Sequence, residues 1–243
     1  MLTRLTPRFV PKVWGSKSLD PLFADSEEKI GEVWFEGLPD HPLLIKFLFT
    51  TEPLSVQVHP EGKTEMWHIL AAEPGAKIAA GFRSPITEER LRASALSGEI
   101  ERLLEWHEAR PGDTFFIPAG TVHAIGAGLT LCEIQQWSDV TYRLFDYGRP
   151  RELHLDEGAR VSRLGPHPAR QSAREGVLVS CPFFTTKKIR VDGSASSNAS
   201  MIVILEGNLK IDGQPTKAGE AWYADAATGP IRLTGQATVL LTS

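Results

Sequence analysis

The sequence predicts an all-β-dominated protein with a small helical insertion, and three features indicate this fold. Short runs rich in β-branched and aromatic residues recur through the first part of the chain, separated by Gly, Pro and Asp, which is the rhythm of a barrel or sandwich. One stretch, residues 86–108, has helical spacing instead. The last part again has the pattern of strands and tight turns. We therefore expect a β-barrel over residues 1–165 and a second, smaller β-domain over residues 176–243.

The predicted strands of the first unit are short and closely spaced. They are Glu32–Gly37, Leu44–Phe49, Leu54–His59, Met66–Leu70, Ala76–Gly81, Thr114–Pro118 and Thr130–Gln136. Each run is bounded by residues that favour turns, so the chain reverses often and each strand can pair with a near neighbour.

Helices are expected at two places. In Ile86–Glu108, Leu91, Ile100 and Leu104 lie near helical spacing, and Ser97-Gly98 interrupts the pattern. Two short helices inserted between strands fit this stretch. A third helix is expected around Leu153–Leu164, after the turn at Arg149-Pro150.

The remaining part of the chain begins with a segment typical of a linker, GPHPARQSA at residues 165–173. Residues 176–243 then contain Gly-Asn, Asp-Gly and Ala-Gly turn signals between apolar runs and no histidine. We expect this cupin-like β-domain to be structural, because it lacks the residue types of a metal site. The tract GSASSNAS at residues 193–200 is expected to be a mobile loop.

Composition limits the partners and the location. The chain has 243 residues, 26 Lys and Arg against 30 Asp and Glu, and a net charge of −4, so no strong field attracts nucleic acid or an anionic membrane. Cys132 and Cys181 are far apart without CxxC spacing, and we expect two reduced, buried side chains. With neither an apolar signal core nor an apolar run of about 20 residues, the chain is expected to be cytoplasmic, as a monomer or homodimer.

A first candidate metal segment is LSVQVHPEGKTEMW, residues 54–67. In an extended chain the side chains alternate between two faces, so Gln57 and His59 point the same way. The Pro-Glu-Gly turn that follows leads into a second strand on which Glu65 and His68 face opposite sides. If Glu65 faces the barrel interior, His68 cannot.

A second candidate segment is PGDTFFIPAGTVHAIG, residues 111–126. It matches the cupin pattern G(x)5PxG(x)2H with Gly112, Pro118, Gly120 and His123, and it predicts a cupin, or jelly-roll, β-barrel. The turn at Pro118 and Gly120 sends the chain back into the barrel with His123 facing the first segment. Gln57, His59, Glu65 and His123 would then offer one amide oxygen, two imidazoles and one carboxylate to a divalent ion.

The other histidines lack partners at ligand spacing, and we expect solvated or capping roles for them. They are His41, His107, His154 and His167.

Over about its first two-thirds the chain resembles the type I mannose-6-phosphate isomerases, in a short bacterial form. The matching segments are VWG (13–15), GEVW (31–34), LLIKFLFTTEPLSVQVHP (43–60), GKTEMW (62–67), PAGTVHAIGAG (118–128) and EIQQWSDVTYRLFDYGRPRELH (133–154). The segment between His59 and Glu65 is shorter than is usual in that family, and WGS (14–16) stands in place of WGG.

The resemblance implies one metal ion per chain, held by Gln57, His59, Glu65 and His123. This ion would be Zn²⁺ or another divalent metal. It also implies that Lys46, Lys63, Glu133, Asp139 and Arg143 are the catalytic residues of a mannose-6-phosphate isomerase. The substrate would be a hexose 6-phosphate, converted between mannose 6-phosphate and fructose 6-phosphate through an enediolate. Lys63 and Glu133 are both candidates for the base, and Arg143 could pair with the enediolate or the phosphate.

Some of these residues also have simpler interpretations. Lys46 could be an edge-strand lysine that extends to solvent, and Glu133 and Asp139 could be ordinary turn or strand carboxylates. Arg149 and Arg151 are expected to form a solvated basic turn rather than a phosphate contact.

Two other functions stay open at this point. One is a different metal-dependent cupin enzyme, a dioxygenase or decarboxylase, although glutamine as fourth ligand is unusual for those sites. The other is a non-catalytic sugar-binding or regulatory cupin that keeps the barrel and the metal without turnover.

Overall fold

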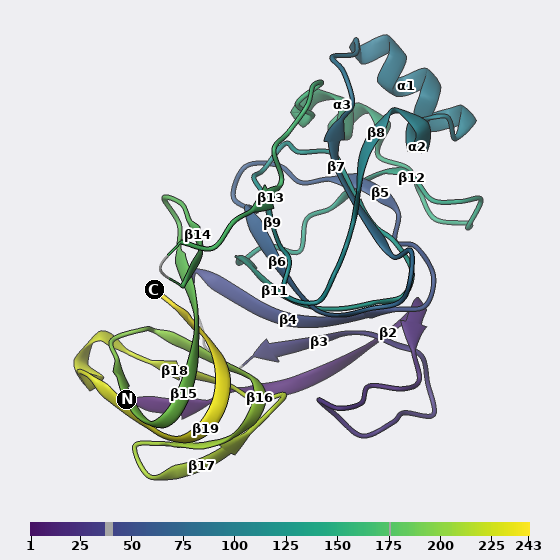
Figure 1. The fold of residues 1–243 in the computed structure, drawn as a ribbon. Helices are drawn as coiled ribbons and strands as arrows, with labels where there is room; N and C mark the ends of the chain where they lie inside the picture. Colours follow the sequence, from purple (N-terminus) through teal and green to yellow (C-terminus); the bar gives the residue numbers. More distant parts are fainter. Residues whose placement is uncertain (37–40, 175) are drawn as a thin grey trace.

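The computed structural model describes residues 1–36, 41–174 and 176–243, and within them the chain forms three antiparallel sheets (Figure 1). The main barrel sheet contains, in spatial order, β13 (Arg170–Gln171), β9 (Thr114–Ile117), β6 (Glu65–Ala72), β11 (Leu129–Gln136), β4 (Leu43–Thr50), β3 (Ile30–Glu36) and β2 (Thr6–Ser16). The short barrel sheet contains β12 (Tyr142–Phe145), β5 (Val56–Val58), β10 (His123–Ile125), β7 (Lys77–Phe82) and β8 (Leu104–Glu108).

The third sheet, called the C-terminal sheet, lies beside the outer face of the main barrel sheet (Figure 1). It contains β1 (Leu2–Arg4), β18 (Ala221–Ala224), β16 (Met201–Ile211), β19 (Ile231–Thr242), β15 (Thr185–Ser197) and β14 (Val177–Ser180), and β17 (Gln214–Lys217) pairs with β16. A short 3₁₀ turn, η1 (Ala226–Thr228), precedes β19. The mostly β fold and its jelly-roll type of barrel agree with the sequence prediction.

Alternation along β4 and β11 separates the barrel interior from the interface with the C-terminal sheet. On β4, Lys46 faces the barrel interior, whereas Phe47 lies in a core with Val203 and Leu240 of the C-terminal sheet. On β11, Glu133 faces the interior in the same way. Each strand therefore presents polar groups to a cavity on one face and an apolar surface to a second layer on the other.

Three helices cover the outer face of the short barrel sheet (Figure 1). They are α1 (Glu88–Ser97), α2 (Ile100–Leu103) and α3 (Leu155–Val161). The side chain of Thr87 accepts a hydrogen bond from the N–H of Arg90 at the start of α1, and Gly98 ends that helix with a left-handed φ of 80°. The expected helix break at Ser97-Gly98 is thus confirmed.

The helical prediction extends too far at its end. Residues 104–108 form strand β8 and pair with β7, with Trp106 opposite Ala79 and Glu108 opposite Lys77. Trp106 also donates its indole N–H to the carbonyl of Glu101 at 2.8 Å, which fixes the turn between α2 and β8. The edge of the short sheet offers backbone partners here, and this tertiary pairing decides the structure.

The other predicted strands agree with the structure within a few residues, except that Leu54–His59 is regular only over Val56–Val58. The end of the predicted strand Glu32–Gly37 falls on Gly37, which lies outside the described residues. Strands β1, β2 and β12 were not expected from the sequence pattern.

Two expectations about the C-terminal part need correction. Residues 193–197 are not a mobile loop, because they continue β15 and pair with β19 from Gly193↔Gly235 to Ser197↔Ile231. The segment 165–173 is packed against the barrel, since Phe116 donates its N–H to the carbonyl of Ala169 at 2.8 Å and residues 170–171 form β13. Small polar residues form strands when a neighbouring strand pairs with their backbone.

The division into units at residues 1–165 and 176–243 stays a prediction, and two observations bear on it. Strand β1 lies in the C-terminal sheet, with Leu2 opposite Ala224. One apolar core also contains residues of both proposed units, among them Phe47 and Val203.

Two further expectations concern helices and cysteines. Within the described ranges, the helices are too short or too polar to span a membrane. Both cysteines are free, and Cys132 is buried as expected, whereas Cys181 is only half-buried.

Candidate active site

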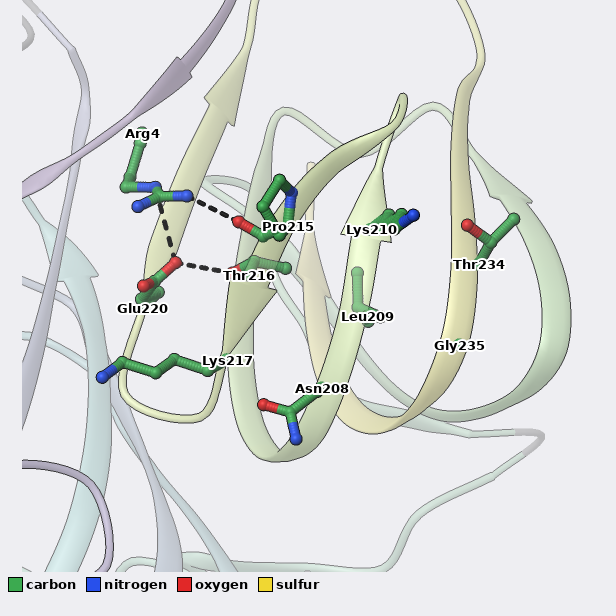
Figure 2. A pocket seen from close by; sticks show the side chains of 10 residues that line it. All are labelled: Arg4, Asn208, Leu209, Lys210, Pro215, Thr216, Lys217, Glu220, Thr234 and Gly235. Atoms are coloured by element: carbon green, nitrogen blue, oxygen red, sulfur yellow. Dashed lines mark hydrogen bonds and ion pairs between the residues drawn. The ribbon is translucent and has the colours of Figure 1, made fainter.

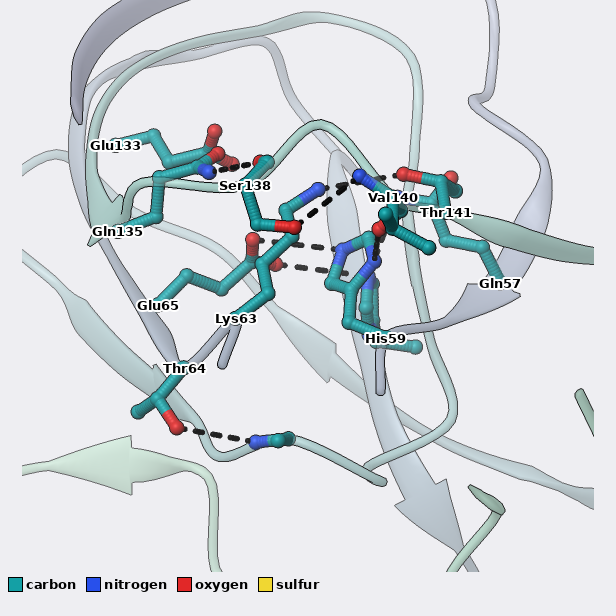
Figure 3. Close-up of polar contacts among 12 residues, drawn as sticks. Gln57, His59, Lys63, Thr64, Glu65, Glu133, Gln135, Ser138, Val140 and Thr141 are labelled. Carbon is teal, nitrogen blue, oxygen red and sulfur yellow. Dashed lines mark hydrogen bonds and ion pairs between the residues drawn. The ribbon is translucent and has the colours of Figure 1, made fainter. Parts of the chain in front are cut away.

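A cavity of about 210 Å³ opens between the two barrel sheets, and its wall contains most of the residues selected from the sequence. Gln57, His59, Lys46, Lys63, Glu65, Glu133, Asp139 and Arg143 all line it, together with Lys12, Trp14, Glu32, Trp34, Ser55, Thr141, Arg151 and several aliphatic side chains. Figure 3 shows how part of this set converges from separate strands.

Strand pairing brings the candidate ligands together. His123 is directly opposite Gln57 in the pairing of β10 with β5, and Glu65 is the first residue of β6 in the facing sheet. The turn before His123 depends on Gly120, whose φ of 82° is left-handed. A Cβ atom there would lie 2.8 Å from the carbonyl oxygen of Val161. The turn that identifies the cupin pattern therefore requires glycine at this position.

The two histidines lie on either side of the Glu65 carboxylate. Nε2 of His59 is 3.4 Å from Oε2 of Glu65, and Nε2 of His123 is 3.5 Å from Oε1. Within the described residues, these three side chains form a group whose ligand atoms all lie within 4.8 Å of one another. The side-chain Nε2 of Gln57 is 3.2 Å from Nε2 of His123, so the amide is adjacent to the same group.

Both Glu65 oxygens are buried and have no hydrogen-bond partner among the residues that the structure describes. A buried carboxylate without a partner is strongly destabilising, and such groups are normally paired or bound to metal. A divalent cation among Glu65, His59 and His123 would satisfy both oxygens, so the residues present fit a metal.

Hydrogen bonds behind the histidines orient their rings. Nδ1 of His59 lies 3.0 Å from the carbonyl of Val140, and Nδ1 of His123 lies 2.8 Å from that of Thr121. A carbonyl can only accept, so each Nδ1 carries the proton and each Nε2 keeps its lone pair facing Glu65. This is the arrangement in which imidazole binds a metal ion.

The protonation states agree with this arrangement. Burial lowers the pKa of His59 to about 4 and also lowers that of His123, although Glu65 opposes both shifts. Burial by itself would raise the pKa of Glu65, yet contact with His59 and the nearby charges keep it well below its usual range. The site thus presents neutral imidazoles and an ionised carboxylate at neutral pH.

Lys46 and Glu133 form a buried ion pair on the cavity wall. Nζ of Lys46 donates to Oε1 of Glu133 at 2.9 Å and to Oε1 of Gln135 at 2.6 Å. Trp67 donates its indole N–H to the other oxygen of Glu133 at 2.9 Å. The inward orientation settles the open choice for Lys46, because its side chain is only 4% exposed and does not reach solvent.

Lys63 and Asp139 are less constrained. Nζ of Lys63 makes a 3.3 Å hydrogen bond to Oγ1 of Thr141. Burial lowers the pKa of Lys63, and the opposing effect of Glu65 does not restore it. Asp139 is exposed at the rim of the cavity.

Arg143 extends into the cavity from β12. Its Nη1 donates to the carbonyl of Glu152 at 2.7 Å. Its buried Nε has no hydrogen-bond partner within the described part of the chain, and Oδ2 of Asp146 is 4.0 Å away. Burial lowers the pKa of Arg143, and the neighbouring Arg151 acts in the same direction. Arg143 thus has a free donor beside the cavity.

The expectation of a solvated basic turn at Arg149 and Arg151 is wrong. Arg151 binds the buried carboxylate of Asp146 through two hydrogen bonds of 2.5 and 2.6 Å. Arg149 donates to the carbonyl of Pro53 at 2.6 Å, and its buried Nη1 has no partner in residues 1–36, 41–174 and 176–243. Asp146, an acid that was not selected from the sequence, organises this group.

The other histidines lie away from the cavity. His68 faces the opposite side of β6, as expected, and its Nδ1 lies 2.9 Å from Oγ1 of Thr114. His154 precedes α3 but does not cap it, because its Nδ1 accepts the N–H of Arg143 at 3.1 Å. His167 contacts the carbonyl of Phe116 at 2.8 Å, and His41 contacts Leu43. His107 is partly buried, and its buried Nε2 has no partner among the described residues, so a solvated role is wrong for it.

The sequence interpretation did not select Lys12, Glu32, Trp34 or Thr141. Lys12 lies on β2, a strand that was not predicted. Glu32 and Trp34 alternate on one face of the predicted strand Glu32–Gly37, and this alternation was the available signal.

A second, larger hollow of about 680 Å³ lies on the C-terminal sheet (Figure 2). Arg4 donates to the carbonyl of Pro215 at 2.6 Å and lies 3.4 Å from Glu220, which also accepts from Thr216 at 2.8 Å. These contacts attach β1 to the sheet. Among the described residues, the lining of this hollow has Glu220 as its single carboxylate and no histidine or cysteine, whereas the group of His59, Glu65 and His123 lies in the barrel.

No protein-family model matches the chain. A curated mannose-6-phosphate isomerase of Streptococcus mutans is 35% identical over 229 residues, which cover 84% of this chain and 71% of that protein. Such identity over most of both chains indicates common ancestry.

Solved structures agree with this relationship. The crystal structure of the mannose 6-phosphate isomerase of Bacillus subtilis is similar with a TM-score of 0.86 and 26% identity, covering 99% of this chain and 98% of that one. A zinc-bound holo structure of mannose 6-phosphate isomerase has a TM-score of 0.76, 16% identity and 99% coverage of both chains. At that identity the likeness shows the fold alone.

Proposed function

The chain belongs to the mannose-6-phosphate isomerase family, and we propose that it interconverts mannose 6-phosphate and fructose 6-phosphate in the cavity between the two barrel sheets. The observation that supports this most directly is the buried group of His59, Glu65 and His123 beside Lys63, Glu133 and Arg143. The relatives favour this function over a dioxygenase, a decarboxylase or a non-catalytic sugar-binding cupin.

Zinc is the metal that we propose for this site, with His59, Glu65 and His123 as ligands and Gln57 as the fourth. The two neutral imidazoles and the unpartnered carboxylate are ligand types that Zn²⁺ takes. When bound, zinc would polarise the oxygens of the sugar and stabilise the negative charge that develops on them.

The cavity has the charge that a phosphorylated sugar requires. Its lining carries five cationic side chains, Lys12, Lys46, Lys63, Arg143 and Arg151, against four carboxylates, Glu32, Glu65, Glu133 and Asp139. A divalent metal would increase this positive excess. We therefore propose that the phosphate lies toward Arg143, whose Nε is a free buried donor.

Isomerisation moves a proton between C2 and C1 of the open-chain sugar, so the site needs a base. We propose Lys63 for this role rather than Glu133. Both oxygens of Glu133 already accept hydrogen bonds, from Lys46 and Trp67. Lys63 has one long hydrogen bond to Thr141. Lys46 would then act as a fixed cation on the wall, and Asp139 as a carboxylate at the entrance.

We also propose that the protein is cytoplasmic and that it acts as a monomer or homodimer. Two free cysteines are compatible with a reducing compartment. Light scattering of the purified protein would determine the oligomeric state.

A coupled assay tests the proposed function. Purified protein, zinc-loaded and chelated, would be supplied with mannose 6-phosphate, glucose 6-phosphate and unphosphorylated mannose. We expect turnover of mannose 6-phosphate in the zinc-loaded protein alone. If fully zinc-loaded protein does not interconvert mannose 6-phosphate and fructose 6-phosphate, the proposed function is wrong, and oxygen consumption would then be measured to test the dioxygenase alternative.

A further inference from the structure

We propose that Glu32 and Trp34 are positioning residues that hold the ammonium group of Lys46 in place on the cavity wall. The inference concerns two residues of β3 that line the cavity without belonging to the metal group. Its effect on kinetics rests on the proposed function. The placement of Lys46 can be tested without any turnover.

The starting observation is a row of side chains that crosses the whole main barrel sheet in register. Each strand contributes one residue to this cross-strand row, which consists of Arg8, Trp34, Lys46, Glu133, Trp67, Phe115 and Arg170. Directly opposed residues on neighbouring strands have adjacent side chains. The row thus combines aromatic, cationic and acidic groups, with an arginine over an aromatic ring at each edge.

Lys46 occupies a position in which its ammonium group has partners in three directions. Two are the hydrogen bonds to Glu133 and Gln135. The third is the ring of Trp34, whose centroid lies 4.5 Å from Nζ. An ammonium group has three donors, and a cation over an indole face is attracted by the ring quadrupole. The orientation of Lys46 therefore depends on Trp34 as well as on its polar partners.

Glu32 in turn fixes the indole. Oε2 of Glu32 accepts the N–H of Trp34 at 3.2 Å and lies 3.1 Å from Nζ of Lys12. The Glu32 side chain is largely shielded from solvent by these partners, with 12% of its surface exposed. Contacts thus run from the Glu32 carboxylate through the Trp34 indole and the Lys46 ammonium to Glu133. Glu133 in turn accepts a hydrogen bond from Trp67.

Trp67 connects this chain to the metal group. Its ring lies against His123 with the centroids 5.3 Å apart. A displacement of Lys46 would remove one hydrogen bond from Glu133. Glu133 would then hold Trp67 less firmly, and Trp67 contacts the proposed ligand His123. Small displacements of this kind reduce turnover strongly when they reach reacting groups.

Charge supports the same role. Burial alone would lower the pKa of Lys46, but Glu133, Glu32 and Glu65 together raise it above its ordinary value. Lys63 also lies close enough for the charge of Lys46 to lower its pKa. Lys12 pairs with Glu32, and Arg8 lies over the Trp34 ring. Lys46 is accordingly a permanent cation, and Glu32 is one of the carboxylates that keep it charged.

Three variants separate the contributions of charge, N–H and ring. Glu32→Gln keeps an acceptor for the Trp34 N–H and removes the charge. Trp34→Phe keeps a ring and removes the N–H, and Trp34→Leu removes the ring. Glu36→Gln, on the same strand, is the matched control, because that carboxylate pairs with Arg8 at 2.8 Å on the surface.

The first measurement uses protein with ¹³C-labelled lysine ε-carbons, in which the Lys46 resonance is assigned by its loss in Lys46→Met. We expect the pKa of Lys46 to lie above its ordinary value in the wild type and to be lower in Glu32→Gln, because Glu32 is one of the carboxylates that raise it. Glu36→Gln should match the wild type. An identical Lys46 titration in wild type and Glu32→Gln would overturn the proposal even if the wild type has no isomerase activity.

The second measurement is steady-state kinetics on the same proteins at equal zinc content. We expect turnover to fall about tenfold in Glu32→Gln and on the order of 10²-fold in Trp34→Leu, with a smaller loss in Trp34→Phe. The loss should appear in kcat rather than KM, and the alkaline limb of Glu32→Gln should move to lower pH. Wild-type kcat in zinc-loaded Trp34→Leu would overturn the positioning role, whereas an inactive wild type would overturn the proposed function instead.

Discussion

Oε1 of Glu65 and Nε2 of His123 lie 3.5 Å apart, both buried, with no hydrogen bond between them. His59 stands in the same relation to the other oxygen of Glu65. Each Nε2 carries a lone pair and cannot donate to the Glu65 carboxylate. A cation between them would pair with the carboxylate oxygens. The geometry that fits a metal therefore comes from β6, β10 and the residue that follows β5.

Metal content should depend on His123 and not on His68. His123→Ala removes an imidazole whose lone pair faces Glu65, and we expect it to lose nearly all bound zinc. His68→Gln should keep the wild-type zinc content, because His68 contacts Thr114 on the opposite face of β6. Elemental analysis of dialysed protein measures both, and stoichiometric zinc in folded His123→Ala would refute the site.

Turnover should depend on the shape of the Arg143 side chain. Arg143→Lys keeps the charge but loses the planar set of donors. We expect activity to fall on the order of 10²–10³-fold, while zinc content and the unfolding temperature stay near wild type. A matched change, Arg110→Lys, alters an arginine that is exposed at the surface and should have no effect. Full activity in Arg143→Lys would mean that charge alone suffices there.

Stability should fall in mild acid because of His68. Burial and the nearby Lys188 lower its pKa to about 4, against an ordinary value of 6.5. Below about pH 6.5 the unfolded chain binds a proton that the folded chain does not, so stability is lost as the pH falls from about 6.5 toward 4. At pH 5 this group should cost about 2 kcal/mol relative to pH 8.

Urea unfolding of metal-free wild type and His68→Gln at both pH values measures this contribution. The variant should lose less stability than the wild type between pH 8 and pH 5, because every other titrating group is common to the two proteins. Equal losses would show that His68 does not contribute to the acid sensitivity.

Phe47 should matter for the whole chain, because it is buried in the core between the main barrel sheet and the C-terminal sheet. We expect Phe47→Ala to lower the free energy of unfolding by about 3–5 kcal/mol. Phe183→Ala, at a side chain that is 50% exposed, should change it by less than about 0.5 kcal/mol. Denaturant unfolding should show a single transition in all three proteins, and two separate transitions would mean that the barrel and the C-terminal sheet unfold independently.

The sequence predicted those parts of the site that follow from local geometry. Gln57 and His59 share a face because strand side chains alternate, and the glycine-dependent turn at Gly120 aims His123. The contacts among Trp34, Lys46 and Glu133 depend on which strands pair and in what register. The pairing and register of strands depend on residues far apart in the sequence, so the local pattern did not predict these contacts.

The same distinction explains the errors in the fold. Residues 104–108 and 193–197 become strands because β7 and β19 lie beside them, although their own composition favours a helix and a loop. Asp146 was overlooked because its role depends on Arg151, five residues later, folding back onto it. Each error concerns residues whose conformation or role is set by partners that the local pattern does not show.

The pairing of β1 with β18 has a consequence for the order in which the chain can fold as it is synthesised. Strand β1 (Leu2–Arg4) leaves the ribosome long before residues 222–224, which are its backbone partners. The outward-facing Phe47 and Phe49 must likewise wait for β16 and β19 to cover them. Until β16, β18 and β19 have been synthesised, the nascent chain therefore carries an unpaired strand and an uncovered apolar face, which are features that recruit chaperones.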